Sequence, residues 1–188
     1  MRREILVAVA AAGLAAGSAV AKTPRDQLIV GLNMANLTSL DPHNMNSYET
    51  HHVLANVYDT LLRADPADPS RLLPRAAASW TAADDGTITF TLRDGMTFHS
   101  GRPVTAADAA GSLRRAVKLN LLGSAYFKEW GYTADNVDQK IRATDARTVV
   151  IEAATPLAPN LQLFVIARAV GAILDVAEVD KHAKDGDM

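Results

Sequence analysis

The stretch from Thr87 to Ala116 constrains the fold more than any other part of the sequence. It opens with apolar residues at every second position, the pattern of a strand with one buried face; these residues are Ile88, Phe90 and Leu92. The Asp-Gly pair at 94–95 then predicts a tight turn into a second short strand at 96–98. The stretch therefore predicts two strands packed in one unit.

A helix is predicted directly after this strand pair. Thr105 and Asp108 have the spacing of a capping box, with Asp in place of the usual Glu, and the helix should run to about Leu119. Its basic end favours a solvated helix terminus over an anion site; this end carries Arg114, Arg115 and Lys118. For His99, just before the helix, we expect a structural hydrogen bond and not a catalytic role.

The remaining pattern predicts short strands and helices in mixed order. We expect a strand at 27–32, a helix from Ser47 through Leu62, a loop at 65–70 and a short helix at 75–80 whose Trp80 is buried. A hairpin is predicted from 140–143 and 148–153, followed by a helix that starts near 156–159. Hairpins in place of βαβ units indicate an α+β fold.

Composition excludes several functional classes. The chain has 188 residues, 48% of them hydrophobic, which is enough to bury one ordinary core. A net charge of -2 gives no reason to expect a nucleic-acid partner, and the absence of cysteine excludes disulfides and zinc-thiolate sites.

The first 21 residues have the pattern of a secretory signal peptide. Arg2 and Arg3 precede an apolar run at 5–16, and an Ala-Val-Ala cleavage box ends at Ala21. The apolar run is shorter than the roughly 20 residues that span a membrane, which argues against the alternative of a membrane anchor. We therefore expect an exported, periplasmic protein whose mature chain starts at Lys22.

No catalytic or metal motif is present. His51 and His52 are adjacent, so on a helix they point about 100° apart and cannot share a metal as an i, i+4 pair would. Neither a Gly-x-Ser-x-Gly elbow nor a phosphate-binding glycine loop occurs. Binding without catalysis is the hypothesis that remains. A periplasmic nickel- or zinc-binding protein or enzyme using His51 and His52 stays open as the alternative.

Several motifs in order resemble one known family. They are LDPH at 40–43, VYDTLL at 57–62, LPRAAASW at 73–80, the stretch from Asp84 to Ala116, and IRATDARTVVIEAATPLAP at 141–159. This succession is similar to the family 5 periplasmic solute-binding proteins, the oligopeptide, dipeptide and nickel receptors of ABC importers. The resemblance covers nearly the whole mature chain and is not specific for the ligand.

The resemblance implies a two-lobed receptor of the type II, cluster C-like periplasmic-binding-protein fold, which closes on its ligand by a hinge motion. It implies capture of a peptide or other small solute for the ABC permease membrane subunits, by a monomer without cofactor, metal or catalytic residue. Only the N-terminal third of such a receptor is resembled, so we expect a truncated fold. Its divisions should be the signal peptide at 1–21, the first strand, ligand loop and helix of lobe I at 22–64, a small α+β subdomain at 65–175, and the start of the return to lobe I at 176–188.

The resemblance also implies ligand contacts. The segment after LDPH, carried over by position, is Asn46, Ser47 and Tyr48, and it would contact the backbone of the ligand as an added strand does. The alternative, that Asn46 and Ser47 only cap the following helix, stays open. Trp130 and Tyr126 lie in a region from which some members direct an aromatic side chain toward the cleft, although burial in the core is favoured for both.

Overall fold

The computed structural model describes residues 23–45, 47–156 and 158–183. The predicted signal peptide and Asn46 lie outside these residues. The chain divides into two units, Met1–Leu32 and Asn33–Met188. In the described part of the first unit the predicted strand at 27–32 is wrong, because no strand forms there. A strand needs a hydrogen-bonded neighbour, and Leu28, Ile29 and Val30 stay exposed without one.

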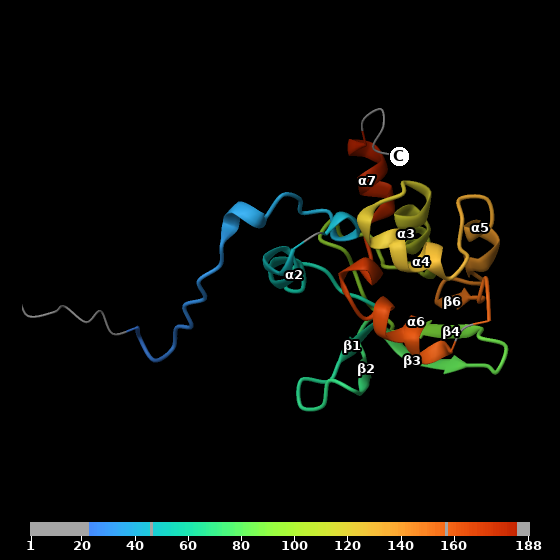
Figure 1. Ribbon diagram of the computed structural model, residues 1–188, viewed down its shortest axis with the longest axis horizontal. Helices are drawn as coiled ribbons and strands as arrows, with labels where there is room; N and C mark the ends of the chain where they lie inside the picture. Colours follow the sequence, from blue (N-terminus) through green and yellow to red (C-terminus); the bar gives the residue numbers. More distant parts are fainter. Residues whose placement is uncertain (1–22, 46, 157, 184–188) are drawn as a thin grey trace, which may run out of the picture. The chain divides into compact units, whose positions relative to one another are not determined.

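A four-stranded antiparallel sheet organises the second unit (Figure 1). Its order is β3-β4-β6-β5, formed by β3 (Ala77–Ala82), β4 (Ile88–Leu92), β6 (Thr148–Ile151) and β5 (Ile141–Ala143). The predicted alternation of β4 is confirmed, because Ile88, Phe90 and Leu92 are all buried. The predicted hairpin of β5 and β6 is confirmed too.

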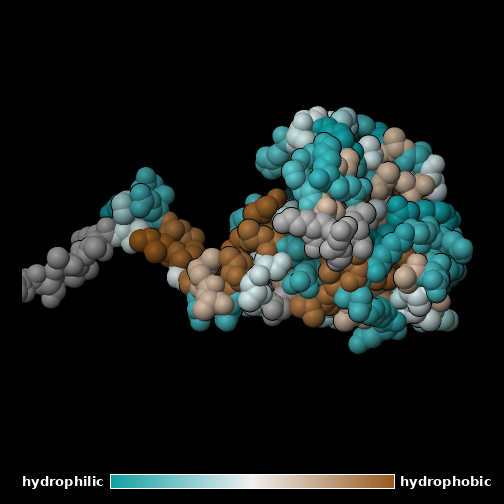
Figure 2. Space-filling view, turned by 90° about the horizontal axis from the view of Figure 1, so that it is seen from above, coloured by the Kyte–Doolittle hydropathy of each residue, from teal (hydrophilic) through white to brown (hydrophobic). Residues whose placement is uncertain are grey.

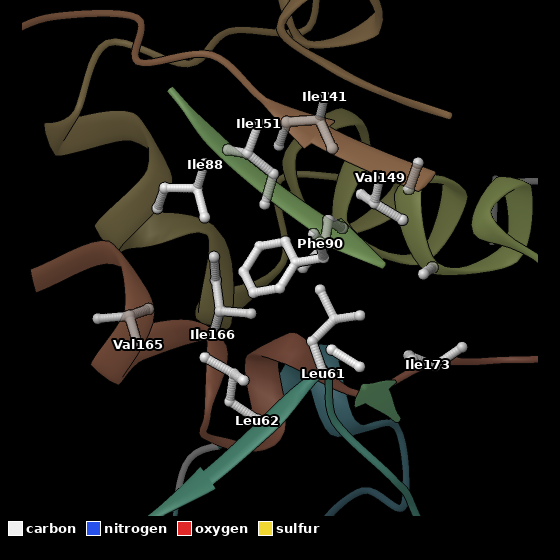
Figure 3. Close-up of a cluster of buried hydrophobic side chains, with 14 of the residues drawn as sticks. Leu61, Leu62, Ile88, Phe90, Ile141, Val149, Ile151, Val165, Ile166 and Ile173 are labelled. Atoms are coloured by element: carbon white, nitrogen blue, oxygen red, sulfur yellow. The ribbon is translucent and has the colours of Figure 1, made fainter. Parts of the chain in front are cut away.

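One long helix covers the sheet where the sequence predicts it. The helix α3 (Ala106–Lys118) packs against β5 and β6, and its Thr105–Asp108 capping box is complete. On the same core lies α6 (Pro159–Ile166), whose Ile166 points at the ring of Phe90 in Figure 3. Leu61 and Leu62 close this cluster from the side of β1 (Leu62–Ala64).

Short elements complete the described part of the chain. A separate hairpin pairs β1 with β2 (Leu72–Pro74). The short helices are η1 (Met34–Asn36), η2 (Pro42–Asn44), α2 (Tyr48–Leu54), η3 (Leu122–Ser124), α4 (Ala125–Glu129), α5 (Val137–Lys140), η4 (Ala169–Gly171) and α7 (Val176–His182). Among these described helices, none has the length and apolar character needed to cross a bilayer.

Two helix predictions and a second strand prediction are wrong. The helix from Ser47 ends at Leu54, because the chain beyond it pairs with residues 172–173. Thr60 forms a β-bridge with Ala172, and the carbonyl oxygen of Asp59 accepts a hydrogen bond from the N–H of Ile173. The helix predicted at 75–80 is β3, held by its ladder to β4, and its Trp80 is only partly buried. The strand predicted at 96–98 forms only a bridge to Pro103, since β3 and β6 already occupy both edges of β4.

Candidate functional site

The predicted ligand segment begins at an anchored aspartate. Asp41 accepts a hydrogen bond from the backbone N–H of His43 at 2.9 Å and so caps η2. Arg115 of α3 donates to both carboxylate oxygens of Asp41, at 3.2 and 2.9 Å. Burial acts to raise the pKa of Asp41, but the hydrogen bonds from Arg115 and from His43 N–H outweigh it, and the pKa is lowered. This charged pair ties η2 to the long helix.

His43 sits beneath the same segment and is fully buried. Its Nε2 lies 3.3 Å from the carbonyl oxygen of Ala172, and its Nδ1 lies 3.3 Å from Nη1 of Arg115. A guanidinium can only donate, so Nδ1 is the acceptor and Nε2 carries the proton given to Ala172. Burial lowers the pKa of His43 to about 4. The ring is therefore neutral and locks η2 to the residues after η4.

Ser47 and Tyr48 follow at the start of α2. Ser47 Oγ accepts from the backbone N–H of Thr50 at 3.1 Å, so Ser47 does cap the helix. The Tyr48 side chain is 72% exposed, and its ring meets the edge of His52 at a centroid distance of 4.3 Å. Met45 and Ser47 both have extended backbone conformations. The helix-capping interpretation thus holds for Ser47, while Tyr48 faces outward.

A groove with a volume of about 750 Å³ opens beside this segment. The groove is lined by the start of α2, by η3 and α4, and by the residues around η4. Its polar and aromatic lining includes Ser47, Tyr48, His51, Tyr126, Glu129 and Arg168. Close packing fixes its floor, because a Cβ on Gly123 would lie 2.9 Å from His43 O and 2.8 Å from Val170. The anchored residues above therefore support the groove directly.

The aromatic residues divide between the groove and the core. Tyr126 of α4 lines the groove and is 50% exposed. Trp130 is only 6% exposed, packs against Phe127 at 5.9 Å between ring centroids, and does not line the groove. The structure thus brings Ser47, Tyr48 and Tyr126 together. A ligand contact by Trp130 stays a prediction.

An arginine and a glutamate line the groove without an ion-pair partner among the described residues. Neither Arg168 nor Glu129 forms an ion pair within the part of the chain that the structure describes. The pKa of His51 is lowered, first by burial and then by the charges of Arg168 and His52, which favours the neutral ring. Sequence patterns gave no signal for Glu129 or Arg168, because neither belongs to a motif.

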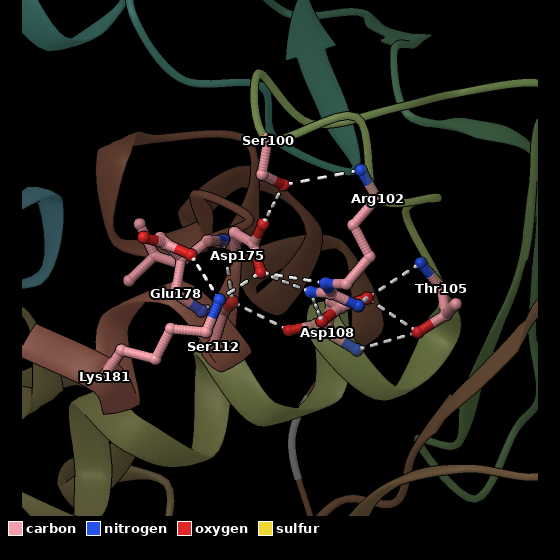
Figure 4. A network of polar contacts seen from close by, with 9 residues as sticks. Ser100, Arg102, Thr105, Asp108, Ser112, Asp175, Glu178 and Lys181 are labelled. Atoms are coloured by element: carbon pink, nitrogen blue, oxygen red, sulfur yellow. Dashed lines mark hydrogen bonds and ion pairs between the residues drawn. The ribbon is translucent and has the colours of Figure 1, made fainter.

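A second, smaller hollow lies next to a network of polar side chains. It has a volume of about 420 Å³, and its apolar lining includes Met96 and Phe98. Beside it, Arg102 binds Asp108 and Asp175, and Ser100 donates to Asp175 at 2.6 Å (Figure 4). The pKa of Arg102 is raised by the hydrogen bonds to Asp108 and Asp175. This network joins the starts of α3 and α7, as turn and cap residues do.

His99 and the basic end of α3 behave differently from expectation. His99 is exposed and makes no hydrogen bond among the described residues, so its predicted structural hydrogen bond is wrong. The basic end is not simply solvated: Lys118 pairs with Asp138 at 2.6 Å, and Arg115 holds Asp41. These partners are distant in sequence and could not be read from it.

The adjacent histidines form no metal site with the other residues that the structure describes. The rings of His51 and His52 are 6.4 Å apart between centroids and inclined at 64°. Among the described residues, no group of three or more His, Cys, Asp or Glu side chains could hold a metal ion.

The surface of the second unit that Figure 2 shows is mostly hydrophilic, with apolar residues gathered in patches.

Residues 71–188 match the sequence model described as "Bacterial extracellular solute-binding proteins, family 5 Middle". The chain belongs to this family. This confirms the resemblance found from the motifs. The family 5 chain is 36% identical over 156 residues to a probable peptide ABC transporter periplasmic-binding protein of Sinorhizobium fredii, covering 78% of this chain and 27% of that one. It is 31% identical to the probable D,D-dipeptide-binding periplasmic protein of Escherichia coli, covering 88% of this chain and 31% of that one.

Solved structures of similar proteins agree with the fold. The murein tripeptide binding protein of Escherichia coli superposes with a TM-score of 0.66 and 27% identity, covering 78% of this family 5 chain and 30% of that chain. Haemophilus influenzae OppA in complex with the peptide RPPGFSPFR gives a TM-score of 0.66 at 26% identity, with 76% and 29% covered. The α+β fold is therefore that of part of a periplasmic binding protein, and the chain spans under a third of the length of these relatives.

Proposed function

We propose that this chain is the N-terminal portion of the substrate-binding component of an ABC importer, which captures peptides or similar small solutes in the periplasm. The relatives support this function, because their names describe peptide- and dipeptide-binding periplasmic proteins. The signal peptide proposed at 1–21 fits the same compartment, with cleavage after Ala21. The ABC permease is the proposed membrane partner, and the receptor is proposed to act as a monomer.

The groove beside α2 is proposed as one wall of the ligand site. The observation that carries this proposal is the convergence of an extended segment and two exposed aromatic rings on a single hollow, contributed by Ser47, Tyr48 and Tyr126. Extended backbone offers N–H and C=O groups to an extended peptide, and rings offer apolar area to its side chains. Asn46, between Met45 and Ser47, is proposed to contribute to the same wall.

Binding by this wall alone should be weak. A ligand pocket normally buries most of its ligand between opposing surfaces, whereas the rings of Tyr48 and Tyr126 are 72% and 50% exposed. We therefore expect dissociation constants in the millimolar range, which correspond to a binding free energy of about −4 kcal/mol.

Titration of the ¹⁵N-labelled chain with trialanine, followed by NMR chemical shifts, tests the proposal. Shifts should cluster at Ser47, Tyr48, Gly123 and Val170. Tyr48→Ala should weaken binding by about fourfold, because burying one methyl group of trialanine against the ring contributes roughly 0.8 kcal/mol.

Val57→Ala is the matched control, since Val57 is exposed but does not line the groove. It should leave the affinity unchanged. Shifts centred on Met96 and Phe98 would place the ligand in the second hollow and contradict the proposal. Micromolar affinity would contradict the expectation for a single wall.

A further inference from the structure

The strand β3 forms one edge of the four-stranded sheet, and part of its backbone has no partner (Figure 1). In an antiparallel pair, successive residues direct their N–H and C=O groups alternately toward and away from the neighbouring strand. Thr81 bonds to β4, because it is in phase with Ala83, whose N–H donates to Thr87 O at 2.8 Å. The backbone groups of Trp80 and Ala82 therefore point away from β4, and no other backbone group among the described residues binds them.

The free edge is short and carries no charge. Its beginning is covered, because the N–H of Ala77 donates to Leu61 O at 3.0 Å, and a register shift follows between Ala77 and Ser79. The side chains of residues 78–82 are exposed or partly buried, and none of them is charged. Exposed sheet edges are usually guarded by charged residues or proline. The opposite edge strand, β5, has such a guard in Arg142 and also lies against α3.

The sequence of this edge is complementary to itself. Two copies of β3 that run antiparallel, with Trp80 opposite Trp80, place Ser79 of each copy opposite Thr81 of the other. Aromatic pairs and Ser–Thr pairs are favourable across neighbouring strands, and no like charges meet in this register. The same register brings Arg75 of one copy to the level of Asp85 of the other, once at each end of the contact. A shift by two residues in either direction loses this match of opposite charges.

Both charged residues are available for such a contact. Asp85 is exposed and forms no ion pair within the part of the chain that the structure describes. Arg75 binds Asp59 through its Nε at 2.5 Å. A guanidinium has five N–H donors, so Arg75 can keep this partner and still attract a second carboxylate.

We propose that β3 pairs with β3 of a second copy of this chain, so that the two sheets join into one continuous sheet. Trp80 of each copy exchanges N–H···O=C bonds with Trp80 of the other, which satisfies backbone groups that have no partner in the single chain. The contact is small, so the two copies should associate only at high protein concentration. β3 does not line the groove beside α2 or the second hollow, so each copy keeps its own proposed ligand wall.

Sedimentation equilibrium tests the pairing. Between about 10 μM and 1 mM the average mass should rise from that of one chain toward that of two. S79K/T81K puts like charges opposite each other and should raise the dissociation constant of the dimer by at least about tenfold. S79E/T81E should do the same. An equal mixture of these two variants sets lysine opposite glutamate and should restore the dimer, which makes the mixture the matched control for the substitutions themselves.

Introduced cysteines test the register, since the chain has none of its own. Ser79 of one copy and Thr81 of the other form a non-hydrogen-bonded pair, whose Cα atoms lie about 4.5 Å apart in such ladders and within reach of a disulfide. Mild oxidation of S79C mixed with T81C should give a cross-linked dimer. Either variant oxidised alone should give little, because each introduced cysteine then faces a hydroxyl residue.

The opposite results would disprove the pairing. They are a chain that stays monomeric up to about 1 mM, or a dimer that persists in S79K/T81K. Failure of the lysine and glutamate variants to associate when mixed, although each melts like the parent chain, would also contradict it. Cross-links that form as readily in S79C or T81C alone would disprove the register about Trp80. None of these results bears on the proposed ligand wall, because β3 lies outside the groove.

Discussion

Gly171→Ala should destabilise the chain more than a methyl group added at any other glycine that the structure describes. A Cβ on Gly171 would lie 1.9 Å from Ile166 O and 2.6 Å from Ile166 C, and both are backbone atoms that cannot move aside alone. Ile166 is fully buried against the central core. Overpacking of this kind costs about 3 kcal/mol or more, or about 6–12 °C in Tm for a chain of this size.

Thermal melting followed by circular dichroism measures this effect. Gly31→Ala is the control, because nothing lies within 4 Å of a Cβ at Gly31 and its backbone has no positive φ. That variant should stay within about 0.5 kcal/mol of the parent. If Gly171→Ala melts with the control, the close approach of η4 to α6 is not as described.

Stability should also fall as the pH drops from about 6.5 toward 4. The pKa of His43 is lowered by burial from 6.5 to about 4 in the folded chain. Above pH 6.5 neither state binds the proton, so His43 adds no dependence on pH there. Between the two values only the unfolded chain binds it, and the free energy of unfolding should drop by about 3 kcal/mol across this window.

The groups that face His43 define the control experiments. Arg115 from α3 and the carbonyl of Ala172 contact the ring, and Asp41, the N-cap of η2, accepts from the backbone N–H of His43. Urea unfolding of His43→Gln between pH 7 and 4.5 should lose most of the slope, because Gln does not titrate. His51→Gln should keep most of it, since His51 is partly exposed. An unchanged slope in His43→Gln would contradict the assignment of a buried neutral ring.

Local signals predicted the parts of the fold that local physics determines. Alternation at Ile88, Phe90 and Leu92 reports one buried face, and the capping box at Thr105 and Asp108 satisfies helix N–H groups within three residues. Neither depends on a distant partner. These elements therefore appear in the structure where the sequence places them.

Predictions failed where distant segments decide the outcome. The alanine-rich residues 75–80 favour a helix by propensity, yet the ladder to β4 makes them a strand. The apolar pattern that continues through Leu61 and Leu62 is typical of a helix face, but the bridge from Thr60 to Ala172 extends the chain. In both cases tertiary hydrogen bonds outweigh a preference worth tenths of a kcal/mol per residue.

The candidate site, like the fold, was predicted in part from the sequence. Family resemblance pointed to Ser47 and Tyr48, and the structure places both at one groove. Neither Arg168 on the groove nor the anchor that Arg115 forms with Asp41 was predicted. Arg168 belongs to no motif, and Asp41 and Arg115 lie 74 residues apart. What the sequence could not supply is the convergence of α2, α4 and η4 on one surface.

Contacts between a bound peptide and the rings of Tyr48 and Tyr126 test the central claim most directly. Intermolecular nuclear Overhauser effects can be measured between trialanine methyl groups and the ¹⁵N,¹³C-labelled chain. If the groove is a ligand wall, cross-peaks should appear to both rings, since both line it and are exposed. Cross-peaks to Met96, Phe98 and Val104 of the second hollow, without any to the two tyrosines, would contradict it.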